Sequence, residues 1–160
     1  MFPLKTILVA TDFSEISDRA LTYAAELAEK FNARIVLLHA YEIPVFSFPD
    51  GAVVATVDII SKLTNSANNA LQKSAQQIAQ KGIAIEALLR EGPPAEEVNR
   101  AVAEVEADLI VIGTHGRRGI ARALLGSVAE KIIHISSRPV LVIHEAKQTP
   151  KTHLTPSTKI

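Results

Sequence analysis

Glycines in the C-terminal third of the chain have the spacing of a phosphate-binding loop. Gly113 and Gly116 follow the apolar run 109–112, and Gly126-Ser127 precede a segment of helical pattern. Because glycine tolerates positive φ and has no Cβ, such a loop can bring backbone N–H groups close to a phosphate. The start of the helix adds unpaired N–H groups and a partial positive charge. The order of strand, glycine loop and helix therefore predicts an anion site.

Polar side chains beside these glycines offer further contacts, and each also has an ordinary structural interpretation. Arg117 is adjacent to Gly116 and is the best phosphate ligand of a small cluster that includes Arg118 and Arg122, although all three also fit a solvated basic face. His115 lies inside the loop, where it can donate to a phosphate or point to solvent.

Ser127 has two possible roles. With Glu130 it matches a capping box that would satisfy the first N–H groups of the helix, and the same hydroxyl could contact a phosphate. The two roles can share one residue, so a substitution there does not separate stability from binding by itself.

Apolar runs of strand length alternate with segments of helical period along the chain. The predicted strands are 7–10, 35–38, 83–89, 109–112 and 140–143. The predicted helices are 14–31, 58–81, 94–105 and 127–136, and 42–57 is predicted to be a long loop or flap. Ser14 is the expected cap of the first helix, and Gly82 is expected to end the second.

The helical periods also predict which side chains face the core. In the first helix these are Ile16, Ala20, Tyr23, Ala24, Leu27 and Phe31. In the second they are Ile59, Leu63, Ala67, Ala70, Leu71, Ala75 and Ile78.

This alternation predicts an α/β fold, a single doubly wound domain with a five-stranded, mostly parallel sheet and four helices. We expect the domain to span 1–146 and residues 147–160 to form a disordered tail. Ligands of such sheets bind outside the carboxyl ends of the strands, where the strand order reverses. If the first and fourth strands are neighbours, Asp12 and Gly113 meet at that point.

Composition excludes several classes of function. The 160 residues carry 17 basic and 17 acidic side chains, so the formal charge is zero and no basic surface for nucleic acid is predicted. The chain has no cysteine, which excludes disulfides and thiolate chemistry and fits a cytoplasmic protein. No signal peptide and no apolar run of membrane-spanning length are evident, so we expect a soluble protein without membrane contact.

Several motifs in order resemble the universal stress protein family over about residues 4–144. The glycines spell G-x2-G-x9-G-S, the nucleotide-binding signature of that family. Further matching segments are 7–14, which ends in Thr11-Asp12-Phe13-Ser14, and 36–40, 125–130 and 138–142. Agreement of separate motifs with the predicted elements makes the match specific. The resemblance implies a Rossmann-like fold of the adenine nucleotide alpha hydrolase type.

The resemblance also implies a set of ligand contacts for ATP, AMP or another adenine nucleotide. Asp12 would contact the ribose, the backbone of Ala40 would hold adenine, and the glycine loop would surround ribose and phosphates. The full implied set is Ala10, Thr11, Asp12, Ala40, Ile112, Gly113, His115, Gly116, Arg117, Gly126, Ser127 and Val128. Asp12 could instead cap the following helix, and a nucleotide-bound Mg²⁺ could also use it.

We expect an ATP-binding regulatory switch with at most slow hydrolysis and no assigned catalytic residue. It would act in a stress response through an unidentified protein partner. The alternatives are a nucleotide hydrolase or transferase using the same pocket and an interaction module that binds no nucleotide. The resemblance further implies a homodimer through the last strand, Val140, Leu141, Val142 and Ile143. His39, His134, His144 and His153 show no metal-ligand spacing and are expected to have structural or surface roles.

Overall fold

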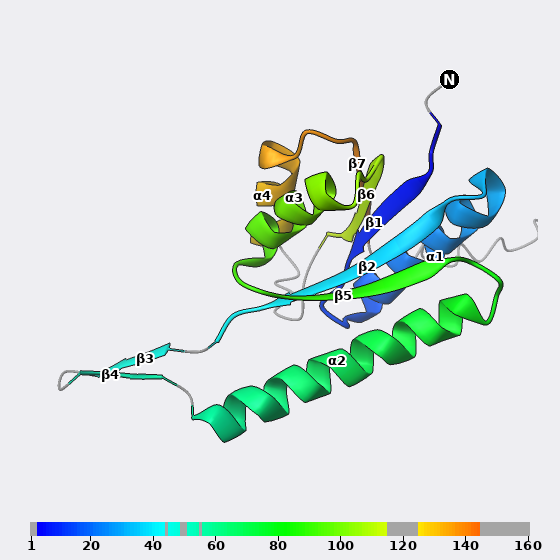
Figure 1. Cartoon of the computed structure of the whole chain (residues 1–160). Coiled ribbons are helices and arrows are strands. Elements are labelled where there is room, and N and C mark those ends of the chain that lie inside the picture. Colours follow the sequence, from blue (N-terminus) through cyan, green and yellow to red (C-terminus); the bar gives the residue numbers. More distant parts are fainter. Residues whose placement is uncertain (1–2, 44, 49–50, 55, 115–124, 145–160) are drawn as a thin grey trace, which may run out of the picture.

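The computed structural model describes residues 3–43, 45–48, 51–54, 56–114 and 125–144, and the tail predicted at 147–160 lies outside them. At its centre, five strands form a sheet in which every neighbouring pair is parallel, in the order β5-β2-β1-β6-β7 (Figure 1). The strands are β1 (Thr6–Ala10), β2 (Arg34–Tyr41), β5 (Ile85–Glu91), β6 (Leu109–Gly113) and β7 (Val140–Ile143). The doubly wound α/β prediction is confirmed, with this sheet parallel throughout.

Four helices cover the two faces of the sheet. They are α1 (Glu15–Phe31), α2 (Val57–Ala79), α3 (Pro94–Glu104) and α4 (Ser127–Ile135). Helices α1 and α2 lie on one face, and α3 and α4 lie on the other (Figure 1). As predicted, Ser14 is the N-cap of α1 and accepts a hydrogen bond from the backbone N–H of Ser17.

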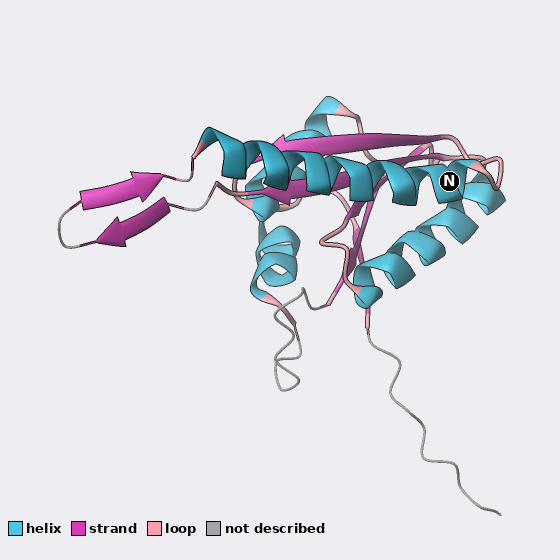
Figure 2. Cartoon of the chain, turned by 90° about the horizontal axis from the view of Figure 1, so that it is seen from below, coloured by secondary structure: helices cyan, strands magenta, loops and turns pink. Residues whose placement is uncertain are grey.

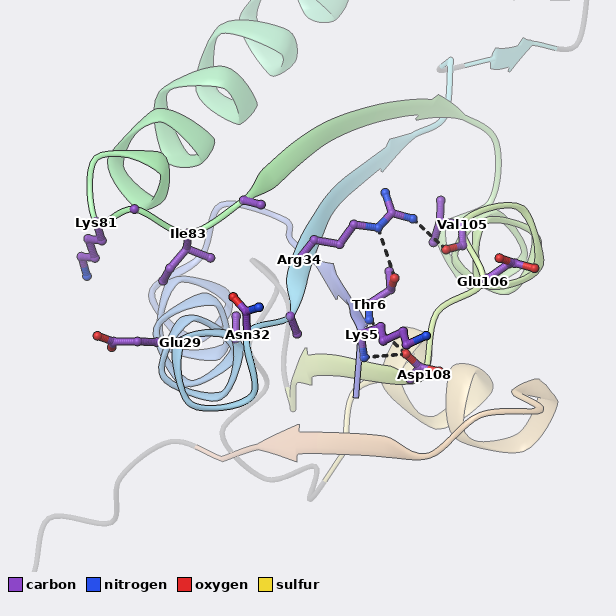
Figure 3. A pocket seen from close by; sticks show the side chains of 14 residues that line it. Lys5, Thr6, Glu29, Asn32, Arg34, Lys81, Ile83, Val105, Glu106 and Asp108 are labelled. Carbon is purple, nitrogen blue, oxygen red and sulfur yellow. Dashed lines mark hydrogen bonds between the residues drawn. The ribbon is translucent and has the colours of Figure 1, made fainter. Parts of the chain in front are cut away.

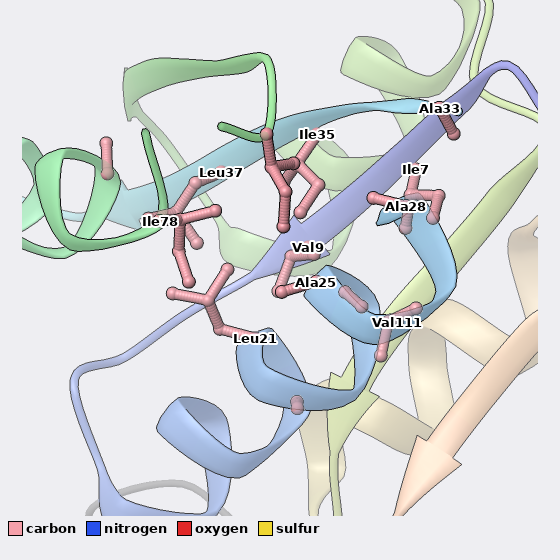
Figure 4. Packing of buried hydrophobic residues seen from close by; sticks show 14 of the residues in the cluster. Ile7, Val9, Leu21, Ala25, Ala28, Ala33, Ile35, Leu37, Ile78 and Val111 are labelled. Carbon is pink, nitrogen blue, oxygen red and sulfur yellow. The ribbon is translucent and has the colours of Figure 1, made fainter. Parts of the chain in front are cut away.

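Strands β1, β2 and β6 each contain an uninterrupted apolar run, because both of their faces are buried. Alternate residues of β1 point to opposite faces, so that Ile7 and Val9 pack against α1 and α2 while Leu8 packs against α3 and α4. Figure 4 shows the first of these clusters, where Leu21, Ala25 and Ala28 of α1 meet the strands. Apolar burial on both faces therefore fixes the ends of the central strands in space.

The helical periods predicted wider buried faces on α1 and α2 than the structure has. On α1, Tyr23 and Phe31 are each 46% exposed, because the sheet contacts a stripe of small residues centred on Ala24, Ala25 and Ala28. On α2 the fully buried side chains are Leu71, Ala75 and Ile78 in the C-terminal half. Ile59 and Leu63 are about half exposed, since the N-terminal half of α2 extends past the end of the sheet (Figure 1).

The segment predicted as a long loop contains a β-hairpin. Strands β3 (Val45–Phe48) and β4 (Gly51–Val54) pair antiparallel with each other and form a separate two-stranded sheet. The hairpin projects from the domain beyond the N-terminal end of α2 (Figures 1 and 2). Proline and glycine in this segment favoured a loop, but Pro44 and Pro49 flank β3, and Gly51 is the first residue of β4.

Asp108 fixes the amino-terminal end of β1. Its Oδ2 accepts hydrogen bonds from the backbone N–H groups of Lys5 at 2.8 Å and Thr6 at 3.0 Å. These two donors hold the pKa of the Asp108 carboxyl below its usual value. The carboxylate thus joins the entry of β1 to the entry of β6.

We expect Asp108→Ala to lower the free energy of unfolding by about 1–2 kcal/mol at pH 7, because two N–H groups lose a charged acceptor. A depressed folded-state pKa contributes stability above the unfolded pKa and loses it as the pH falls through the folded value. The difference from wild type should therefore shrink as the pH falls below about 4. Urea unfolding at pH 7 and pH 3 checks this, and an equal difference at both would contradict it.

Candidate functional site

The strand register brings the predicted site residues to one edge of the sheet. Val9 is level with Leu37 on one side and with Val111 on the other. Three residues further along each chain segment are Asp12, Ala40 and Thr114, so these positions lie at or just beyond the carboxyl ends of three adjacent strands. We call this the carboxyl edge. The expected juxtaposition of the first and fourth strands is confirmed, and it is where the strand order reverses.

Asp12 lies in a tight turn between β1 and α1. Its Oδ1 accepts hydrogen bonds from the backbone N–H of Ser14 at 3.1 Å and from the Ser14 hydroxyl at 2.5 Å. The cap of α1 is Ser14 itself, so Asp12 does not cap that helix and instead orients the capping serine. The carboxylate is held by its neighbours at the carboxyl edge.

Phe13, the next residue, has an uncommon left-handed backbone conformation with φ of 62°. Its N–H donates to the Thr11 hydroxyl oxygen at 3.0 Å, and the buried Thr11 hydroxyl also bonds that of Ser17 at 3.0 Å. Backbone strain of this kind persists only where surrounding contacts enforce it, and it gathers at functional sites. The turn therefore presents Asp12 in a fixed position.

His39 on β2 supports this turn from the neighbouring strand. Its Nδ1 lies 2.7 Å from the carbonyl oxygen of Thr11, so Nδ1 carries the proton and donates. Its ring also packs on that of Phe13, with centroids 4.4 Å apart. The structural role predicted for His39 is correct, but its connection to the candidate site was not predicted. In the sequence, the one signal for this connection is the position of His39 near the end of a strand, beside Ala40.

Two substitutions of His39 separate the contribution of its hydrogen bond to stability from that of its ring. His39→Phe keeps an aromatic ring and leaves the Thr11 carbonyl without this donor, so we expect a loss of about 1–2 kcal/mol of unfolding free energy. His39→Asn can place its amide N–H near the position of Nδ1 and should recover part of that loss. Urea unfolding of both variants checks the order, and equal stabilities would contradict it.

The two ends of the glycine motif meet at the same edge. The carbonyl oxygen of Thr114, directly after β6, accepts a hydrogen bond from the N–H of Gly126 at 2.6 Å. Thr114 is itself buried and donates its N–H to the carbonyl of Ile143 at 2.9 Å. Thr114 and Gly126 are therefore direct neighbours in space. Between them in the sequence, His115, Gly116 and Arg117, with Arg118 and Arg122, lie outside the described residues.

Close packing against Ile16 explains why position 113 is a glycine, and the sequence did not reveal this reason. A Cβ there would lie 3.0 Å from Cγ2 and 3.1 Å from Cγ1 of Ile16. The missing side chain thus allows the start of α1 to pack closely against the end of β6. This packing places the Asp12 turn and the glycine loop side by side.

Ser127 is not the cap of α4. The N-cap residue is Gly126, which has no side chain to act as a cap and whose carbonyl accepts the N–H of Glu130 at 2.9 Å. The predicted capping box of Ser127 and Glu130 is therefore wrong, because Ser127 is already the first helical residue. Ser127 and Val128 are exposed in the first turn of α4, where backbone N–H groups concentrate.

The remaining predicted site residues are placed by the strands. Ala10 ends β1, and Ala40 is the penultimate residue of β2; both are half-buried. Ile112 on β6 is 3% exposed, and its side chain packs with the α3 and α4 cluster. Any ligand contact at Ile112 is therefore made by its backbone.

Negative charge accumulates beside the Asp12 turn. Burial, together with the charges of Asp12 and Glu15, raises the pKa of the Asp18 carboxyl above its usual value. This potential favours a cation near the turn. Among the described residues, no three acidic or histidine side chains are grouped closely enough to hold a metal ion by themselves.

A cavity of about 910 Å³ lies at the opposite, amino-terminal edge of the sheet (Figure 3). Several of its polar groups have partners within the protein. The Arg34 guanidinium donates to the Thr6 hydroxyl at 3.2 Å and to the Val105 carbonyl at 3.0 Å, and Asp108 binds the start of β1. We therefore interpret this cavity as a consequence of how the strand and helix ends are joined.

Fold and site together define an α/β domain whose carboxyl edge combines an acidic turn with the two ends of the glycine motif and the start of a helix. The model of the Universal stress protein family matches residues 3–144. The chain belongs to the universal stress protein family. Universal stress protein MJ0531 of Methanocaldococcus jannaschii is 34% identical over 145 residues, covering 90% of this chain and 84% of that protein.

Solved structures support the same fold. Protein MJ0577 of M. jannaschii superposes with a TM-score of 0.78 at 26% identity, covering 92% of this chain and all of the other. A universal stress protein in complex with cAMP gives 0.66 at 28% identity, over 89% and 98% of the two chains. One from Archaeoglobus fulgidus in complex with dAMP gives 0.62 at 25%, over 89% and 99%. No helix among the described residues is long and apolar enough to cross a membrane.

Proposed function

We propose that this chain binds an adenine nucleotide, with ATP as the preferred ligand, at the carboxyl edge and acts as a nucleotide-dependent regulatory protein. The observation that carries the proposal is the hydrogen bond between Thr114 and Gly126, which closes the glycine loop beside the strained turn of Asp12. Relatives solved with cAMP and dAMP support adenine as the base. Triphosphate recognition rests on the loop glycines and on the start of α4, where the N-cap residue is a glycine.

Each group has a distinct role in this proposal. The Asp12 carboxylate accepts hydrogen bonds from the ribose hydroxyls, and the backbone of Ala40 pairs with adenine. Backbone N–H groups of the glycine loop and of Ser127 and Val128 bind the phosphates, together with Arg117. A Mg²⁺ ion on the phosphates would lie toward Asp12 and keep most of its water ligands.

Thermal unfolding with and without excess Mg-ATP tests the proposal. Ligand at about 100 times its Kd adds about 2.7 kcal/mol of stability, a shift of several degrees for a domain of this size. The shift should be present in wild type and absent in Gly116→Val, whose side chain obstructs the loop. The proposal fails if nucleotide-free wild type shows no shift, and the interaction module then becomes the better account.

Hydrolysis is proposed to be slow, because no side chain in the described part of the carboxyl edge is placed as a general base for water. Steady turnover of ATP by purified wild type, lost in Gly116→Val, would instead identify a hydrolase. Regulation then follows from ordering of the loop by ligand, which shifts the population that a protein partner recognises.

We further propose that β7 pairs with β7 of a second copy. It is the last strand of the sheet, hydrogen-bonded to β6 on one side, and its four residues are all apolar. An apolar edge strand favours pairing with another chain. Light scattering checks this proposal, and a monomer at high protein concentration would contradict it.

A further inference from the structure

A buried serine behind the Asp12 turn makes contacts that the proposed nucleotide site does not use. Ser17 is in the first turn of α1 and is 3% exposed, so its side chain is shielded from any ligand at the carboxyl edge. Serine is a weaker helix former than alanine, and burial of a hydroxyl is favourable only where the hydroxyl is hydrogen-bonded. The contacts of the Ser17 hydroxyl therefore indicate why a serine is present at this position.

The Ser17 hydroxyl connects the two residues on either side of the Asp12-Phe13 pair. Its Oγ donates to the carbonyl oxygen of Ser14 at 2.8 Å and lies 3.0 Å from the hydroxyl oxygen of Thr11. Thr11 precedes Asp12 in the sequence, and Ser14 follows Phe13. One hydroxyl thus bridges the turn that carries the carboxylate.

The directions of these hydrogen bonds follow from which atoms can donate. A carbonyl and a carboxylate only accept, so the Ser17 proton goes to the Ser14 carbonyl and the Ser14 hydroxyl proton goes to Oδ1 of Asp12. The Thr11 hydroxyl then donates to Ser17, while its oxygen accepts the N–H of Phe13 at 3.0 Å. Each of the three hydroxyls donates once, and that of Ser14 donates to the Asp12 carboxylate.

The backbone of Phe13 shows what this bridge opposes. Its φ of 62° is uncommon for a residue with a Cβ and persists only where neighbouring contacts enforce it. Without the Ser17 hydroxyl, the link between Thr11 and Ser14 is lost and the turn can relax. The carbonyl of Ser14 still accepts the N–H of Asp18 at 3.0 Å, so the start of α1 keeps its first hydrogen bond. The expected consequence is a displaced carboxylate on a folded domain.

We propose that Ser17 is a positioning residue for the ribose, because its hydroxyl holds the Asp12 carboxylate where that group accepts hydrogen bonds from the ribose hydroxyls. This inference rests on the proposed nucleotide site and assigns a role to a residue outside the set of ligand contacts. A fixed acceptor binds more tightly than a mobile one, since less conformational freedom is lost on binding. Ser17 therefore contributes to affinity only through the ligand groups that Asp12 contacts.

Binding of ATP compared with dideoxy-ATP, whose sugar lacks both ribose hydroxyls, tests this role. In titration calorimetry with Mg²⁺, Ser17→Ala should bind ATP about 10-fold more weakly than wild type. Its affinity for dideoxy-ATP should change by less than about 2-fold, because that ligand has no group for Asp12 to accept from. Ser17→Cys, kept reduced, retains a weak donor and acceptor, so its ATP affinity should lie between those of wild type and Ser17→Ala. The cysteine variant also tests the role if the alanine variant does not fold.

Two further variants control for the lost hydroxyl and for lost stability. Thr22→Ala removes another α1 hydroxyl that donates to a backbone carbonyl, that of Asp18 at 3.0 Å, but Thr22 is exposed and further along the helix. Ile35→Val leaves a small cavity in the core near the start of β2, at the other end of the strand from Ala40. Neither variant should change the ratio of the two nucleotide affinities.

The outcomes distinguish this inference from the nucleotide proposal on which it rests. If Ser17→Ala shows no loss, or an equal loss for both nucleotides, the positioning role is overturned while nucleotide binding stands. The role is also overturned if wild type does not prefer ATP to dideoxy-ATP, or if Ile35→Val shows the same selective loss. Absence of ATP binding by wild type would overturn the nucleotide site itself, and the role of Ser17 with it.

Discussion

Replacing Ser127 with aspartate is expected to weaken ATP binding by about 100-fold or more without destabilising the fold. Ser127 is the first residue of α4, exposed at the carboxyl edge, and the N-cap residue before it is Gly126, which has no side chain to act as a cap. A carboxylate there occupies the N–H groups proposed for the phosphates and repels a polyanion. The same negative charge interacts favourably with the helix dipole, and it should add about 0.3–1 kcal/mol to stability.

The opposite signs of these two effects separate binding from folding. A binding loss caused by a damaged fold would lower the unfolding temperature of the nucleotide-free protein, whereas Ser127→Asp should raise it or leave it unchanged. Ser137→Asp is the matched control, because Ser137 is exposed just beyond the other end of α4. Titration calorimetry with ATP, together with thermal unfolding, checks both effects. Wild-type affinity in Ser127→Asp would place the phosphates elsewhere.

The second large effect is expected at Gly92, where Gly92→Ala should lower the free energy of unfolding by about 2–4 kcal/mol. Its φ is 142°, a conformation that side chains with a Cβ rarely adopt. A Cβ there would also lie 2.8 Å from Oε1 of Glu97, whose side chain is buried and paired with Arg100. Because Gly92 donates its N–H to the carbonyl of Tyr41, backbone movement would disturb the end of β2.

Gly82→Ala provides the comparison, because Gly82 has a φ of 81° but nothing lies within 4 Å of the position its Cβ would take. Strain alone should cost about 1–2 kcal/mol at that position. Urea unfolding of the two variants compares a positive φ without close neighbours with a positive φ combined with the Glu97 contact. A loss at Gly92 no larger than that at Gly82 would contradict the effect predicted for Gly92.

The strands and the start of α1 were predictable because their signals are local. Continuous apolar runs identified four of the five parallel strands, alternation identified β5, and Ser14 identified the start of α1. The strand order was not predicted, and adjacency of the first and fourth strands was only the condition under which Asp12 and Gly113 meet. The predicted features depend on residues that are close in sequence or on general rules of α/β sheets.

Features that depend on tertiary contact were not predictable. Tyr23 and Ile59 have core-like spacing, but both are exposed. The sheet contacts the small residues of α1 instead of Tyr23, and Ile59 lies where α2 extends past the end of the sheet (Figure 1). The capping box at Ser127 was wrong because α4 begins one residue earlier than the motif requires. Neither the close packing of Gly113 on Ile16 nor the support of the Asp12 turn by His39 leaves a local pattern in the sequence.

Titration calorimetry of nucleotide-stripped wild type with Mg-ATP tests directly whether the carboxyl edge binds a nucleotide. Denaturing extraction and chromatography first establish that no nucleotide remains bound after purification. We expect one ATP site per chain. The Asp12→Ala variant should bind ATP more weakly, because the ribose hydroxyls lose their acceptor. Absence of measurable binding by the stripped protein at millimolar ATP would contradict the assignment of the carboxyl edge as a nucleotide site.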